Sequence, residues 1–92
     1  MALTKKAPKV NFSFDTETID NSHLILYNDD INSFEYVIDC LIKVCHHDPI
    51  QAEQCATIAH FNDKCAIKTG SFDELKPLHQ QLGALNLTTS ID

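Results

Sequence analysis

The spacing of apolar residues divides the chain into short elements of alternating kind. Residues 23–27 (HLILY) form an apolar run that stops at three polar residues, which is typical of a buried strand followed by a turn. Weaker alternation predicts two further strands, over residues 64–69 and 84–91. Apolar side chains three and four positions apart predict helices over residues 33–46, 49–61 and 71–83. The predicted order is therefore β-α-α-β-α-β.

Polar residues at the helix starts support these predictions. Asn32 offers a side-chain cap with Glu35 three residues later, and Asp48 precedes a proline at the first position of the second helix. Ser71 and Glu74 have the spacing of a capping box. Because the first turn of a helix leaves its N–H groups unpaired, such acceptors mark where helices begin.

Two residues are expected to shape the third helix. Gly83 stands where helices commonly end on a residue in the left-handed conformation. Pro77 lies inside the helical pattern and has no N–H group to donate. We therefore expect Pro77 to kink this helix or to delay its start, and Gly83 to end it.

The first part of the chain has a different composition. Residues 1–21 mix lysines, acidic residues and a proline without sustained periodicity, so they cannot bury enough apolar surface to offset the entropy lost on ordering. We expect a flexible N-terminal arm over residues 1–21. The remainder, residues 22–92, is long enough for one small α+β domain.

Charge and hydropathy exclude two classes of partner. The 92 residues have a formal net charge of −6 with only seven lysines and arginines, which argues against nucleic acid and better suits a cationic ligand group. The chain has no apolar run near the roughly 20 residues that span a bilayer, and its first residues lack the apolar stretch and small-residue cleavage site of a signal peptide. We expect a cytoplasmic protein that binds neither nucleic acid nor membrane.

The cysteines and histidines leave one alternative open. The four cysteines lie in apolar periodic segments, where thiols usually act as small buried hydrophobes. Cys40 and Cys45 are five apart, unlike the short Cys pairs of structural zinc sites, so a metal-stabilised structural protein-interaction domain is the weaker alternative. A Cys-His hydrolase would need a nucleophile, a base and an orienting residue placed together, and the sequence has no Gly-rich elbow to present them. We therefore expect no enzymatic activity.

Three groups of residues are candidates for a binding site. Asn28, Asp29 and Asp30 follow the first strand, although Asn and Asp in such a place ordinarily form a turn. His60 lies one helical turn after Ala56, and Phe34 and Val37 share one face of the first helix, as packed residues also do. None of these signals is specific when taken alone.

Together, the candidates match one family pattern. The strand Leu24-Ile25-Leu26-Tyr27 leads into Asn28-Asp29-Asp30, a helix follows with Phe34-Glu35-Tyr36-Val37-Ile38-Asp39, and a second helix ends on Ala59-His60. This arrangement resembles the ClpS adaptor family over roughly residues 22–89. The resemblance implies a single α+β domain in which a three-stranded antiparallel sheet packs against three helices.

The resemblance also implies a site that binds peptides. Asn28, Asp29 and His60 correspond to the residues that hold the α-amino group of an N-terminal degradation signal. The pocket for the first side chain corresponds to four apolar residues: Phe34, Val37, Ala56 and Leu85. Leu87 is the alternative to Leu85. Relatives commonly have Met where this chain has Phe34 and Ala56.

The implied partners follow from the same family. An adaptor of this kind binds N-degron peptides and proteins with a bulky hydrophobic first residue and docks on the N-terminal domain of a Clp AAA+ unfoldase. The arm, residues 1–21, is expected to take part in substrate handover. The resemblance implies a monomer that needs no cofactor and no metal.

Overall fold

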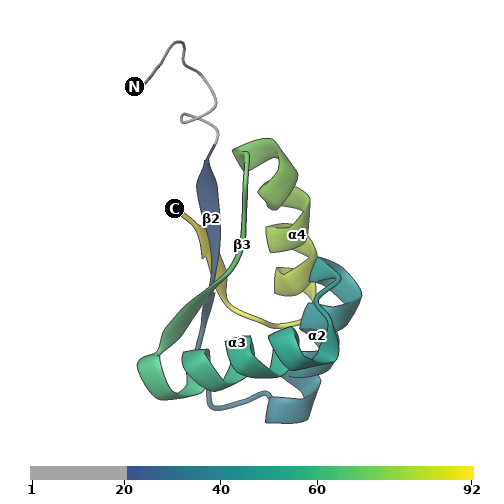
Figure 1. Cartoon of the computed structure of the whole chain (residues 1–92), viewed down its shortest axis with the longest axis vertical. Coiled ribbons are helices and arrows are strands. Elements are labelled where there is room, and N and C mark those ends of the chain that lie inside the picture. The colour runs from purple at the N-terminus through teal and green to yellow at the C-terminus, as the bar shows by residue number, and fades with distance from the viewer. Residues whose placement is uncertain (1–20) are drawn as a thin grey trace, which may run out of the picture.

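The computed structural model describes residues 21–92, and almost all of the predicted arm lies outside them. These residues form three helices and three strands in the predicted β-α-α-β-α-β order (Figure 1). Their bounds are β2 Ser22–Tyr27, α2 Phe34–Cys45, α3 Pro49–Asn62, β3 Lys64–Gly70, α4 Phe72–Ala84 and β4 Thr89–Ile91. The predicted α+β fold is therefore confirmed.

The sheet is antiparallel, with β2 between β3 and β4. Tyr27 pairs with Lys64, so the end of β2 lies beside the start of β3. The register shifts between Leu24, which pairs with Lys68, and Ile25, which pairs with Ala66. One extra residue in β3, Ile67, explains why its alternation is weak in the sequence, because a bulge interrupts the two-residue period.

The helix starts follow the predicted chemistry with one shift. Ser71 and Glu74 form the expected capping box of α4, and the Asp48 side chain accepts from the Gln51 amide at the start of α3. The cap of α2 is Ser33, which accepts from the Tyr36 amide, and not Asn32 as the sequence suggested. Asn32 has other partners, described with the site below.

The core lies between the sheet and the three helices. Leu24 and Leu26 of β2 are buried in one cluster with residues of all three helices; α3 and α4 lie against the sheet, and α2 packs on both of them (Figure 1). The face of α3 is made of small side chains, which let this helix approach its neighbours closely. Its buried residues are Ala52, Cys55, Ala56 and Ala59.

The end of α4 corrects the predicted last strand. Gly83 lies inside the helix, and the left-handed residue is Asn86, with φ 70°. The Leu87 amide donates to the Leu82 carbonyl at 3.0 Å and the Asn86 amide to Gly83 at 3.0 Å, which is the hydrogen-bond pattern of a Schellman end. Because Leu82 and Leu87 are both buried, their packing places the helix end later than Gly83, and the strand covers only Thr89–Ile91.

Pro77 and the cysteines can be compared with what the sequence predicts. α4 begins at Phe72, so Pro77 lies within the helix and does not delay its start. All four cysteines are free thiols, with Cys40, Cys45 and Cys55 buried. Within residues 21–92, the helices are too short or too polar to cross a membrane.

Candidate functional site

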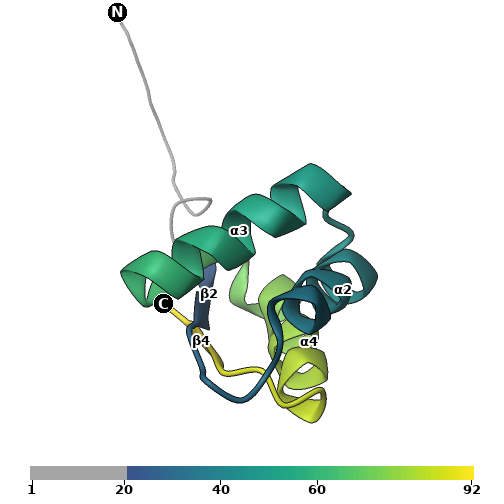
Figure 2. The same cartoon turned by 90° about the horizontal axis from the view of Figure 1, so that it is seen from below.

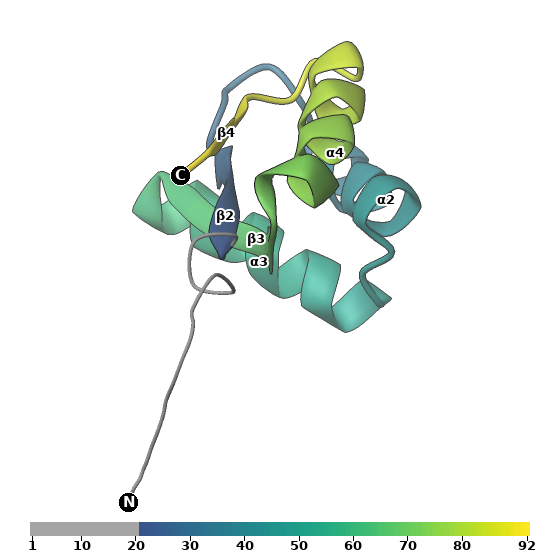
Figure 3. The same ribbon diagram turned by 90° about the horizontal axis from the view of Figure 1, so that it is seen from above.

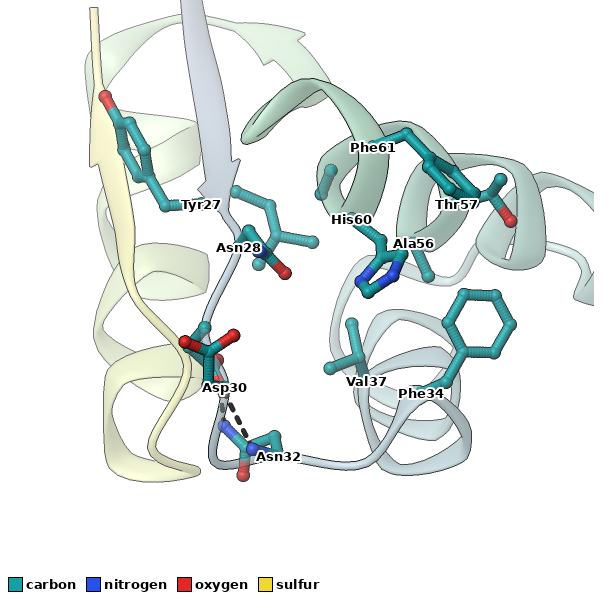
Figure 4. Close-up of a pocket in the computed structure, with 13 residues that line it drawn as sticks. Tyr27, Asn28, Asp30, Asn32, Phe34, Val37, Ala56, Thr57, His60 and Phe61 are labelled. Atoms are coloured by element: carbon teal, nitrogen blue, oxygen red, sulfur yellow. Dashed lines mark hydrogen bonds between the residues drawn. The ribbon is translucent and has the colours of Figure 1, made fainter.

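A cavity of about 530 Å³ opens between the end of β2, the start of α2 and the last turns of α3 (Figure 4). Polar side chains border one side of it and apolar side chains the other. The lining includes two carboxylates and, among the described residues, no lysine or arginine. The residues that line it are Leu26, Tyr27, Asn28, Asp29, Asp30, Asn32, Phe34, Val37, Ala56, Thr57, Ala59, His60 and Phe61.

Pairing of β2 with β3 positions Asn28 against the end of α3. The Asn28 amide donates to the carbonyl of Asp63 at 2.8 Å, one residue before β3 begins. Asp63 is the C-cap of α3 and has a positive φ of 73°, so the helix ends beside the last residue of β2. The side chain of Asn28 is exposed on the cavity side (Figure 4).

His60 reaches the same cavity from the last turn of α3. It lies one turn after Ala56, and Figure 4 shows both side chains on the cavity wall. The ring of Phe61 packs edge-on against the ring of His60, with centroids 4.9 Å apart. His60 is exposed at the rim of the cavity.

Asp29 is engaged by its own loop. Its Oδ1 accepts from the amides of Ile31 at 2.9 Å and Asn32 at 2.8 Å, and its Oδ2 accepts from the Asn32 side chain at 3.1 Å. Partial burial raises the pKa of Asp29, but the hydrogen bonds from Asn32 and Ile31 outweigh it, so the pKa lies below its ordinary value. Asp29 is thus a charged acceptor at the cavity mouth.

Asp30 also lines the cavity, and its carboxylate stands apart from this turn (Figure 4). It is exposed, in contrast to half-buried Asp29. Two adjacent carboxylates give this end of the cavity a negative potential that favours a cationic group. The sequence pattern singled out the tripeptide, but the resemblance assigned a role only to Asn28 and Asp29.

Asn32 connects the loop to the end of α4. Besides binding Asp29, its side-chain amide donates to the carbonyl of Asn86 at 2.8 Å. The Tyr36 hydroxyl donates to the carbonyl of Leu85 at 2.8 Å. The turn after α4 therefore supports the β2–α2 loop through its backbone.

Leu85 differs in position from the other residues expected in the pocket. Its side chain does not line the cavity and instead packs, half-buried, against the core. Its rival Leu87 is buried in the core and does not line the cavity either. The strand predicted from residue 84 is replaced by the end of α4, and β4 covers only Thr89–Ile91.

The apolar side of the cavity comes from two helices. Val37 and Phe34 project from the first turns of α2, and Ala56 from α3 (Figure 4). Phe34 is 38% exposed and lies at the mouth, whereas Ala56 is 4% exposed and forms part of the wall. The short side chain of Ala56 leaves room between α3 and α2.

Sequence reasoning did not assign several lining residues to the site. Thr57 and Phe61 lie on the last turns of α3 next to Ala56 and His60, so helical spacing could have suggested them. The sequence suggests Asn32 only as a helix cap. Its place beside the cavity depends on the contact with Asn86, which is 54 residues away.

The cysteines and histidines do not gather into a metal centre in the described part of the chain. Across residues 21–92, no group of three or more His, Cys, Asp or Glu side chains could hold an ion. Burial raises the pKa of Cys55 to about 12, with contributions from neighbouring Cys65 and Cys45. His47 donates from Nε2 to the Ile67 carbonyl, 2.7 Å away.

The sequence is similar to those of known proteins over most of its length. The model of the family "ATP-dependent Clp protease adaptor protein ClpS" matches residues 17–89, beginning within the segment expected to be the arm. The ATP-dependent Clp protease adapter protein ClpS of Synechocystis is 32% identical over 73 residues, which are 78% of this chain and 74% of that protein.

A solved structure shares the fold. Agrobacterium tumefaciens ClpS2, bound to L-phenylalaninamide, aligns with a TM-score of 0.68 over 79% of this chain and 95% of that one, at 19% identity. The family match, the Synechocystis relative and the β-α-α-β-α-β architecture together lead to one conclusion. The chain belongs to the ClpS family of Clp protease adaptors.

Proposed function

We propose that this protein captures polypeptides by a free N-terminal α-amino group and a bulky hydrophobic first side chain, and delivers them to a Clp AAA+ unfoldase and its protease. One observation carries the proposal: acceptors for an ammonium group and an apolar wall border the same cavity. The protein acts by binding, without making or breaking a bond.

The polar end of the cavity supports recognition of the amino group. An N-terminal ammonium has three N–H donors and a positive charge, whereas an internal peptide bond has one N–H and no charge. Asn28 and His60 offer acceptors on opposite sides of the cavity mouth, and Asp29 adds a negative charge nearby. Charge-assisted hydrogen bonds contribute about 1.5–3 kcal/mol each, which is enough to distinguish a chain end.

The apolar wall supports selection of the first side chain. Phe34, Val37 and Ala56 present carbon atoms to the cavity. Burying a Leu or Phe side chain there contributes about 1.5–3 kcal/mol, while a charged side chain would lose its hydration. The L-phenylalaninamide bound by the Agrobacterium structure has a free amino group and a benzyl side chain, consistent with the same ligand class here.

A binding titration tests the capture step. Peptides that differ only in the first residue and its acetylation are titrated against the full chain by fluorescence anisotropy. We expect Phe, Tyr, Trp and Leu to bind, Ser to bind weakly, and N-acetylation to weaken binding by about tenfold or more. Asn28→Ala and His60→Ala should each weaken binding, and Gln80→Ala on α4 is the matched control. Equal affinity for free and acetylated peptides would contradict the proposal.

Delivery is tested separately. We propose that the folded domain docks on the N-terminal domain of the unfoldase and that residues 1–21 assist handover. A substrate beginning with Phe should be degraded by the cognate Clp protease faster when the full chain is present. A chain starting at Ser22 should keep its peptide affinity and lose this stimulation. If the chain that starts at Ser22 stimulates degradation as well as the full chain does, residues 1–21 play no part in delivery.

A further inference from the structure

Phe61 is a large apolar side chain that the fold does not bury. Helix α3 lies along one margin of the domain (Figures 2 and 3), and Phe61 stands on its last turn with 76% of its surface exposed. The side chain lines the cavity next to His60. Because an exposed ring removes little apolar surface from water, the core gains little from Phe61, and its role is sought in what the ring contacts.

The ring of Phe61 contacts the ring of His60. Their centroids are 4.9 Å apart and their planes meet at 79°, which is the edge-to-face arrangement that pairs of aromatic rings prefer. Figure 4 shows Asn28 on one side of the His60 ring and Phe61 on the other. Phe61 therefore packs on the side of the imidazole that faces away from Asn28.

His60 differs from three other histidines of the domain in what orients its ring. His23 and His79 hydrogen-bond threonine hydroxyls at 3.0 Å and 2.6 Å, and His47 donates to a backbone carbonyl at 2.7 Å. Within residues 21–92 the His60 ring makes no hydrogen bond, so the edge contact with Phe61 remains to orient it. A neutral imidazole has one acceptor nitrogen, and leaving that nitrogen without an internal partner keeps it available for a ligand.

The backbone under this pair of rings is fixed, so the freedom left to His60 is that of its side-chain torsions. At the C-cap of α3, the Asp63 carbonyl accepts from the Asn28 amide at 2.8 Å. A histidine in a helix has about two favoured χ1 wells and two ring orientations, which together give about four states. The acceptor nitrogen of His60 points at a bound amino group in roughly one of these states.

We infer that Phe61 is a positioning residue for His60: its ring keeps the imidazole in the orientation that accepts a hydrogen bond from the α-amino group of a bound chain. The inference rests on the proposed function and gives Phe61 no contact of its own with that amino group. An apparent dissociation constant rises in inverse proportion to the fraction of molecules in the binding-competent state. Loss of the Phe61 ring should therefore weaken binding of a free N-terminus by up to about fourfold.

The first test titrates Phe61→Ala, in the full chain, with a peptide whose first residue is Phe and with its N-acetylated form. The free peptide should bind about two- to fourfold more weakly than it does to the wild type. The affinity of the acetylated peptide should not change, because that peptide has no amino group for His60 to bind. Phe61→Tyr keeps the aromatic ring and should bind both peptides as the wild type does. Phe72→Ala removes an exposed ring from α4 and is the matched control.

A double-mutant cycle shows whether Phe61 acts through His60. In the His60→Ala background, Phe61→Ala should change the affinity for the free peptide by less than about 1.5-fold, because there is no imidazole left to orient. Three-bond couplings to the His60 ring carbon, measured by NMR, should report one χ1 rotamer in the wild type and in Phe61→Tyr, and averaged rotamers in Phe61→Ala. Averaging in the wild type, or a single rotamer in Phe61→Ala, would overturn the inference.

The outcomes distinguish this inference from the proposed function. If the wild type binds free and acetylated peptides equally, both fail. If the wild type requires the free amino group and Phe61→Ala leaves that requirement unchanged, only the inference fails. Equal losses for the two peptides, or a full loss that persists in the His60→Ala background, would assign Phe61 a direct contact with the peptide and overturn the inference. Thermal denaturation should show no change in Phe61→Ala, and a lowered midpoint with equal losses for both peptides would assign Phe61 to the fold instead.

Discussion

Asn32 binds the carboxylate of Asp29 in two ways, donating its backbone amide to Oδ1 at 2.8 Å and its side-chain amide to Oδ2 at 3.1 Å. The same side-chain amide donates to the carbonyl of Asn86 at 2.8 Å. One amide group thus fixes the carboxylate of Asp29 relative to the end of α4. The orientation of the acidic loop depends on a residue with no role in the resemblance.

We predict that Asn32→Ala loosens this loop. The variant loses two side-chain hydrogen bonds on the surface, so the free energy of unfolding should fall by about 1 kcal/mol. Peptide affinity should fall as well, because Asp29 is no longer held at the cavity mouth. Denaturant titration and peptide binding measure the two effects, and Asn62→Ala, at the exposed end of α3, serves as the control. Unchanged peptide affinity would show that Asn32 contributes to stability and not to peptide binding.

Acid should weaken the loop through Asp29. Its pKa in the folded chain lies below the ordinary value of 3.8, so the unfolded chain binds more protons in that range. The stabilisation is therefore fully present above about pH 4 and is lost as pH falls through the lower, folded pKa. Unfolding midpoints of the wild type and Asp29→Asn should differ at pH 6 and converge near pH 2. A constant difference at all pH values would contradict this cause.

Ala56→Met should change which first residue binds best. Ala56 lines the cavity one turn before His60, and its small side chain leaves space that a large ring can fill. The wild type should bind Trp, Tyr and Phe at least as well as Leu, because an unfilled apolar space forfeits contacts. The variant should shift preference toward Leu and keep its dependence on a free amino group.

The measurement for Ala56 is a series of peptides that differ in the first residue. Ala66→Met, at an exposed position on β3, adds the same side chain away from the cavity and should leave the ranking unchanged. If Ala56→Met alters neither the ranking nor the affinity, Ala56 only fills the core and the pocket does not extend to α3.

The left-handed conformation of Asn86 predicts a contrast between two substitutions. Its φ of 70° suits Asn and Gly, but a β-branched side chain clashes there. Asn86→Gly should be close to neutral, whereas Asn86→Val should reduce the free energy of unfolding by about 1–2 kcal/mol. Thermal denaturation of both variants measures this, and equal losses would show that the side chain matters more than the backbone conformation.

The thiols should resist alkylation in the native protein. Burial, together with Cys65 and Cys45, raises the pKa of Cys55 to about 12, so roughly one thiol in ten thousand is ionised at pH 8. Iodoacetamide should modify Cys55 only after unfolding, and half-buried Cys65 should react first. Mass spectrometry of timed samples measures the rate at which each thiol is alkylated. Equal rates for Cys55 in native and unfolded protein would contradict its burial.

The amino-acid sequence by itself determined the order of the elements and most helix starts. The capping box of Ser71 and Glu74, and the cap at Asp48, are local interactions within three residues, so they are readable from spacing alone. The apolar run before Asn28 likewise gave the central strand. The family resemblance supplied the candidates Asn28, Asp29 and His60, of which His60 lies 31 positions after Asp29.

The tertiary structure decided how those residues meet and where the last helix ends. Pairing of Tyr27 with Lys64 places Asn28 beside the end of α3, and the ladder changes register further along, at a bulge at Ile67 that no local pattern reveals. Burial of Leu82 and Leu87 carries α4 past Gly83, and Leu85 packs against the core and is not among the residues that line the cavity. Local rules fail there because burial of a leucine contributes more than the preference of one glycine for a helix end.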